Sequence, residues 1–234
     1  MVALPFEWFE SSEEKAMHWQ VKILLSTVLA ISLPAGADSG QALLAAAGRG
    51  DAPEVRRLLR AGAPVDARDA RQRTPLLLAT WGNHPEAARL LMEGGADVNA
   101  KDKQQDSPYL LAGAQGRNEI LGMTLRHGAD LASTNRYQGT ALIPACERGH
   151  AEAARQLIAA GVKLDHVNRL GWTCLLEVAI LGADSAQHRD IVRQLIAAKA
   201  DLNLADRDGV TALQHARHRG LSGVAALLAE AGAR

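Results

Sequence analysis

The sequence predicts an all-α solenoid of helix-turn-helix repeats. The main observation is a period of 33 residues, marked by triplets that begin with Thr or Ser and by pairs that mostly read Gly-Ala. The triplets begin at Thr74, Ser107, Thr140, Thr173 and Thr211, and the pairs begin at Gly62, Gly95, Gly128, Gly161, Lys199 and Gly232. Both series step by 33 residues except for a single step of 38. Aromatic residues make up only 3% of the chain, which favours thin, closely packed helices rich in Ala and Leu. A period of this length indicates stacked repeats.

An amino-terminal export signal is predicted before the repeats. From Met17 onward, Lys22 supplies a positive charge, residues 23–33 form an uncharged stretch of eleven residues, and Ala35-Gly36-Ala37 fits a small-x-small cleavage site. Eleven helical residues span about 16 Å, whereas a hydrocarbon core is about 30 Å thick. We therefore expect a signal segment at 1–37, cleaved after Ala37, and no integral membrane span in the mature chain.

The first sixteen residues do not fit this signal. Glu7, Glu10, Glu13 and Glu14 are acidic, whereas the region before the apolar stretch of a signal is normally basic. We interpret Met17 as the true start. Two alternatives stay open: residues 1–37 could form a first helix of the fold, or the chain could be translated from Met1 and stay in the cytosol.

Each repeat is expected to begin with a capped helix. Thr74 and Ser107 each precede a proline, and Thr or Ser followed by Pro is typical of an N-cap and a first helical position. A second helix follows, such as residues 151–160, and an Asp or Asn then organises a tight turn. The six repeats are expected at about 38–69, 70–102, 103–135, 136–168, 169–206 and 207–234.

Some positions depart from this pattern. Pro144 lies one residue too late for the free N–H groups of a first turn, so the helix of repeat four is expected to begin late or to bend. Gln105 and Gln138 stand where a turn glycine is usual, so the tips of repeats three and four are expected to differ in shape. Five extra residues within 181–190 predict either a loop that covers the neighbouring apolar residues or a binding insertion.

Residues 74–102 resemble the ankyrin repeat; their sequence is TPLLLATWGNHPEAARLLMEGGADVNAKD. The resemblance covers residues 38–234 as six repeats, of which the first is degenerate. It implies a β-turn and two antiparallel helices per repeat, in a curved solenoid whose concave side carries the turns and first helices. It also implies protein recognition on that side. The block PACERGH, followed by HVNRLGWTCLLEVAI, resembles small exported bacterial ankyrin proteins, which makes residues 147–177 the first choice for a site.

Candidate partner-binding residues follow from these implied positions. Tyr, Trp and Arg are the residue types enriched at interface hot spots. The candidates are Arg73, Trp81, Arg136, Tyr137, Glu147, Arg148, Arg169, Trp172 and Glu177. For Trp172 the alternative is that its ring packs over the neighbouring hairpin.

The segment CERGH, residues 146–150, gathers residue types that also occur in active sites. Cys146, however, occupies a slot held mostly by small residues, and His150 aligns with His84 as a structural histidine. The chain has no Gly-x-Ser-x-Gly elbow, His-Glu-x-x-His pair or phosphate-binding glycine loop. A non-catalytic protein is therefore predicted, and an enzyme using Cys146 or Cys174 with His150 or His166 is the less favoured alternative.

No metal, cofactor or disulfide is expected. His215 and His218 lie three residues apart on a helix, but two histidines alone make a weak metal site, so a solvated polar cap is the preferred interpretation. Cys146 and Cys174 are 28 residues apart, in different slots of consecutive repeats, and are expected to remain unbridged.

The charge balance bears on the partner. The chain carries 26 Lys plus Arg against 26 Asp plus Glu, without a block of like charges. Nothing therefore steers it toward nucleic acid or anionic lipid. The sequence as a whole predicts an exported, non-catalytic scaffold, periplasmic or secreted, that binds an unidentified protein partner through its concave face.

Overall fold

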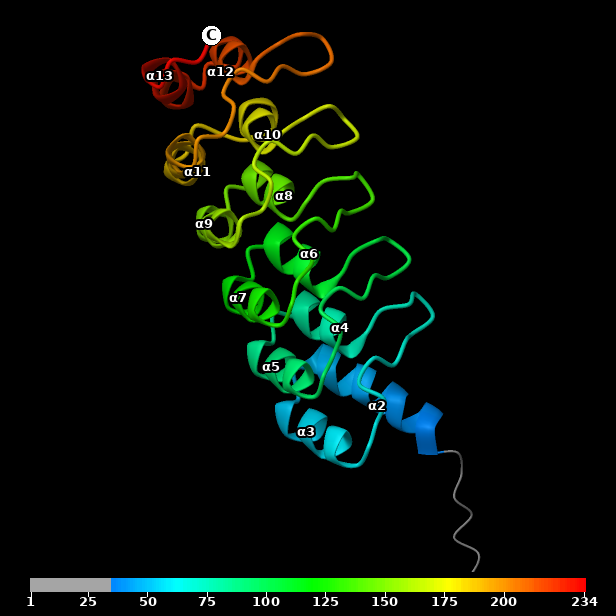
Figure 1. The fold of residues 1–234 in the computed structure, drawn as a ribbon. Coiled ribbons are helices and arrows are strands. Elements are labelled where there is room, and N and C mark those ends of the chain that lie inside the picture. Colours follow the sequence, from blue (N-terminus) through cyan, green and yellow to red (C-terminus); the bar gives the residue numbers. More distant parts are fainter. Residues whose placement is uncertain (1–34) are drawn as a thin grey trace, which may run out of the picture. The chain divides into compact units, whose positions relative to one another are not determined.

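The computed structural model describes residues 35–234, and their regular secondary structure is helical (Figure 1). The helices are α2 (Ala35–Arg49), α3 (Ala52–Arg60), α4 (Pro75–Trp81), α5 (Pro85–Glu93), α6 (Pro108–Ala114), α7 (Asn118–Arg126), α8 (Leu142–Glu147), α9 (Ala151–Ala160), α10 (Cys174–Ile180), α11 (Ala186–Ala197), α12 (Ala212–His218) and α13 (Ser222–Glu230). The predicted all-α solenoid is confirmed. The predicted signal segment lies outside the described residues, except that α2 begins at Ala35.

Within residues 36–234 the helices stack in two rows (Figure 1). Helices α4, α6, α8, α10 and α12 pack against one another in order, and α3, α5, α7, α9, α11 and α13 form the second row. The long loops between repeats project beside the first row. The buried apolar side chains of all these helices form one continuous cluster, so each repeat completes the core of its neighbours.

The Thr and Ser residues that mark the period begin the first-row helices. Their side-chain oxygens accept the backbone N–H three residues later, and a cap of this kind stabilises a helix by about 1 kcal/mol. The capping residues are Thr74, Ser107, Thr173 and Thr211. The residue two positions after each marker is buried in every repeat: Leu76, Tyr109, Leu142, Leu175 and Leu213.

Repeat four is the exception that Pro144 predicts. Its helix begins at Leu142, one residue later than the register, and Thr140 caps nothing. Pro144 has no N–H to donate to the Thr140 carbonyl, and Ile143 donates to that oxygen instead at 3.3 Å. The Thr140 hydroxyl is buried without a hydrogen-bond partner among the described residues.

The five turns between repeats share one hydrogen-bond pattern. In each, the side chain of an Asp or Asn accepts the backbone N–H groups two and four residues later. The five residues are Asp69, Asp102, Asn135, Asn168 and Asp206. Three residues after them the backbone has positive φ, at Gln72, Gln105, Gln138, Gly171 and Gly209. The expectation that glutamine changes the shape of the turn tips in repeats three and four is therefore wrong. The same hydrogen-bonded turn forms there with glutamine in the left-handed region (φ 64° at Gln105 and 59° at Gln138).

The extra residues of repeat five connect it to repeat six. Ser185 caps α11, and the Asp184 carboxylate accepts the N–H groups of Gly223 and Val224 at 2.8 and 3.1 Å, at the start of α13. The loop does not cover the neighbouring Leu181, whose side chain is 50% exposed. This part of the insertion thus tethers the last repeat.

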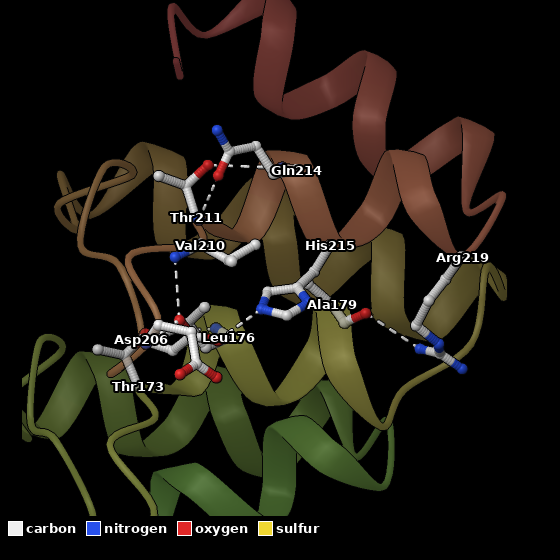
Figure 2. Close-up of polar contacts among 10 residues, drawn as sticks. Thr173, Leu176, Ala179, Asp206, Val210, Thr211, Gln214, His215 and Arg219 are labelled. Carbon is white, nitrogen blue, oxygen red and sulfur yellow. Dashed lines mark hydrogen bonds and ion pairs between the residues drawn. The ribbon is translucent and has the colours of Figure 1, made fainter.

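The last repeat carries a network of polar contacts (Figure 2). Thr211 and Gln214 form a capping box at the start of α12, and His215 Nε2 lies 2.7 Å from Asp206 Oδ2. Arg219 Nη1 donates to the carbonyls of Ala179 and Gly182 at 3.0 and 2.9 Å, across to repeat five. These contacts join a polar terminal repeat to the apolar stack.

Candidate functional site

A cavity of about 470 Å³ opens among the turn tips and the carboxyl ends of α4, α6, α8 and α10. We call this side of the molecule the turn face. Six of the nine candidate residues line the cavity: Trp81, Arg136, Tyr137, Glu147, Arg148 and Glu177. The stacking of consecutive repeats brings together positions that are 33 or more residues apart in the sequence.

The cavity is bordered by exposed apolar side chains. Among the described residues, the large hydrophobic side chains that remain exposed are Trp81 (45%), Tyr137 (44%), Val167 (50%), Leu170 (43%) and Leu181 (50%). All of these except Val167 line the cavity. Apolar surface gathered in one place on a folded protein is typical of an interaction site.

Glu177 provides a buried carboxyl group in the wall of the cavity. It follows the Thr173 cap by four residues on α10, and only 4% of it is exposed. Its Oε1 accepts a hydrogen bond from Asn168 Nδ2 at 2.8 Å, whereas Oε2 is buried with no partner among the described residues. Burial, reinforced by the negative charge of Glu147 and opposed by the Asn168 hydrogen bond, raises the pKa of Glu177 to about 7.

A disulfide joins the two helices that carry these glutamates. Cys146 on α8 and Cys174 on α10 are fully buried and bonded, with their Cα atoms 5.5 Å apart. The expectation of an unbridged pair is wrong. The two slots differ, but α8 packs directly on α10, and this brings the two Cα atoms within the distance that a disulfide requires. The bond also leaves neither sulfur as a thiol, which a cysteine nucleophile would need.

The arginines at the cavity are held by neighbouring repeats. Arg136 lies 3.5 Å from Asp106 and places its guanidinium 5.1 Å from the centre of the Tyr137 ring. Arg169 approaches the same ring at 5.7 Å, and Arg148 donates to the Ala114 carbonyl at 2.7 Å. Tyr137 is thus fixed by two cation–π contacts.

Asp106 also lines the cavity. Burial raises the pKa of Asp106 above its ordinary value, and the positive charge of Arg136 partly offsets this effect. The two groups form the one ion pair among the charged residues of the cavity wall.

Three candidates lie outside the cavity lining. Arg73 is half-buried and pairs with Asp69 of its own turn at 2.7 Å, and Arg169 reaches the site only through Tyr137. Trp172 is partly buried and packs against the hydrophobic core instead of lining the cavity. The candidate set in turn lacks Asp106, Leu170 and Leu181. Leu170 could have been selected from the sequence, because an apolar residue at a turn tip is unusual.

The structure also bears on metal binding. Among residues 35–234 no group of three or more His, Cys, Asp or Glu side chains is placed to hold a metal ion. In the polar cap, His215 contacts Asp206 (Figure 2). In the same part of the chain no helix has both the length and the apolar character needed to cross a bilayer.

Comparison with known proteins gives one family. The family model described as Ankyrin repeats (3 copies) matches residues 14–102 and 110–206. An ankyrin repeat domain from Acinetobacter baumannii AYE, solved by crystallography, is 56% identical with a TM-score of 0.79, over 82% of this chain and 98% of that chain. A second crystal structure, of another ankyrin repeat protein, is 39% identical with a TM-score of 0.78 over the same shares. No curated protein matches the chain.

Proposed function

Because the chain belongs to the ankyrin-repeat family, we propose that it is an exported, non-catalytic scaffold that binds a protein partner through its turn face. In the family this is the concave face. The observation that carries the proposal is the gathering of Trp81, Tyr137, Leu170 and Leu181 around one cavity. Aromatic residues at the centre of a patch are typical of interface hot spots.

The disulfide supports the export part of the proposal. Disulfides persist in oxidising compartments and are rare in the cytosol. The bonded pair Cys146 and Cys174 therefore agrees with the signal pattern of residues 17–37. The second candidate is a cytosolic adaptor translated from Met1, which the acidic residues 7–14 favour.

The compartment is tested by the intact mass of the protein from fractionated cells that express it without an amino-terminal tag. The proposal expects the mass of Asp38 to Arg234 in the periplasmic or secreted fraction, with both sulfurs resistant to alkylation before reduction. A mass that begins at Met1, found in the cytosol with alkylated thiols, would establish the cytosolic adaptor instead.

The binding face is tested by placing a photocrosslinking amino acid at Leu170 or at Val167 in cells. The two side chains are apolar and similarly exposed, but only Leu170 lines the cavity. Crosslinks to a protein from Leu170 but not from Val167 are expected. Equal crosslinking from both positions, or crosslinking from Val167 alone, would contradict the proposal.

A further inference from the structure

The unpartnered oxygen of Glu177 indicates that the cavity is complete only with a ligand. Buried side-chain oxygens are normally hydrogen-bonded, because leaving one unpaired costs free energy. Here Glu177 lines an open cavity and its buried Oε2 has no partner among the described residues, while Asn168 satisfies the other oxygen. A group with an N–H donor that entered the cavity would supply the missing partner.

The charges around the cavity select a positively charged donor. Three carboxyl groups line it, those of Asp106, Glu147 and Glu177, against the two guanidinium groups of Arg136 and Arg148. Asp106 has Arg136 as its ion-pair partner, at 3.5 Å. Within the described residues, no ion pair involves Glu147 or Glu177.

The second guanidinium group of the cavity wall already makes a hydrogen bond within the protein. Arg148 directs its Nη1 to the carbonyl of Ala114, at 2.7 Å. The negative charge of Glu147 contributes to the raised pKa of Glu177, because two like charges repel each other. An incoming cation would relieve this repulsion.

The apolar border indicates how such a cation would be carried. Lysine and arginine have long methylene stems that lie along apolar surface while the charged end reaches a polar group. The exposed side chains of Leu170 and Leu181 line the same cavity as the glutamates. These two leucines can contact both the methylene stem of a lysine or arginine and the apolar residues on either side of it in the partner.

We propose that the cavity receives a lysine or arginine side chain of the protein partner, flanked by apolar residues, with the Glu177 carboxylate as its counter-ion. Glu147 lies beside the same cation and adds to the attraction. This inference rests on the proposed function, because it specifies the chemistry of the partner at the turn face.

The test uses acetylated and amidated peptides of sequence Gly-Leu-Xaa-Leu-Gly, in which Xaa is lysine, arginine, norleucine or glutamate. Binding to the oxidised protein is followed by chemical shifts of its backbone amides at about pH 8, where Glu177 is ionised because its pKa is about 7, up to about 10 mM peptide. The lysine and arginine peptides are expected to shift cavity resonances and to bind at least tenfold more tightly than the other two. Glu177→Gln is expected to remove this preference.

Controls separate the role of the site from general charge and from folding. Glu152→Gln removes an exposed carboxylate on α9 that pairs with Arg155, and it is expected to leave the peptide preference unchanged. The spectrum of each variant reports directly whether it is folded. Glu147→Gln is expected to weaken binding of the lysine peptide less than Glu177→Gln does.

Several results would overturn the inference. These are equal binding of the norleucine or glutamate peptide, no shift of cavity resonances by any peptide, and an unchanged preference in Glu177→Gln. Tight binding of free N-acetyl-lysine amide, equal to that of the peptide, would assign the cavity to a small amine instead. Crosslinking from Leu170 in cells is independent of these peptides, so the proposed function can stand when the charge preference fails.

Discussion

Replacing Glu177 by glutamine is expected to stabilise the folded protein above neutral pH. In the folded state burial raises the pKa of this carboxyl from 4.5 to about 7. The folded protein therefore keeps the proton over a range in which the unfolded chain has already lost it. The contribution of Glu177 to the free energy of unfolding is fully present below pH 4.5, and it is lost as the pH rises through 7.

The magnitude follows from the difference in pKa. One unit corresponds to about 1.4 kcal/mol, so ionisation of Glu177 costs the folded state about 3 kcal/mol at pH 8.5. Glutamine carries no charge, and its carbonyl can accept the hydrogen bond that Asn168 donates at 2.8 Å. The variant should equal the natural protein in stability near pH 4.5 and exceed it by about 3 kcal/mol at pH 8.5.

The assay is urea unfolding of both oxidised proteins at pH 4.5, 5.5, 7.0 and 8.5, with the difference in free energy plotted against pH. Titrating groups that do not interact with Glu177 cancel in that difference. Glu152→Gln is the control, because a hydrogen bond from Arg155 lowers the pKa of Glu152 to about 2. Its difference in free energy should change only slightly above pH 4.5 and stay flat from pH 5.5 to 8.5. A difference for Glu177→Gln that stays flat, or falls as the pH rises, would refute the reasoning.

Three further predictions concern stability. Reducing the bond between Cys146 and Cys174, which closes 28 residues, should lower the free energy of unfolding by about 3 to 4 kcal/mol in urea; a loss under about 1 kcal/mol would contradict this. Gln105→Gly should raise the free energy of unfolding by about 1 kcal/mol, since φ is 64° there; unchanged or lower stability would show that the turn carries no such strain. Arg219→Ala removes two hydrogen bonds to repeat five, so it should cost about 1 to 3 kcal/mol and speed hydrogen exchange in α12 and α13 first; uniform exchange over all repeats would argue against a local tether.

The sequence was sufficient to predict the fold because each repeat is specified locally. Thr74 and Ser107 begin helices through contacts three residues away, and Pro144 delays one by removing a single donor. The register of such signals, and with it the stacking of neighbouring helices, can be counted along the chain.

The candidate site was only partly predictable, because its chemistry depends on contacts between repeats. The positions of Trp81 and Tyr137 on the turn face follow from the register. The burial of Glu177 depends on what α8 and the Asn168 turn place around it, and the disulfide depends on the distance between two packed helices. Neither property is carried by any one repeat.

The disulfide also makes one part of the solenoid resist extension more than the rest. A stack in which each repeat contacts only its neighbours is expected to peel apart repeat by repeat when its ends are pulled. The segment from Cys146 to Cys174, which are separated by 28 positions, would not extend. At roughly 3.4 Å per residue, this removes about 95 Å from the extended length. Under load, the helices that bear Glu147 and Glu177 would stay joined while the repeats on either side give way.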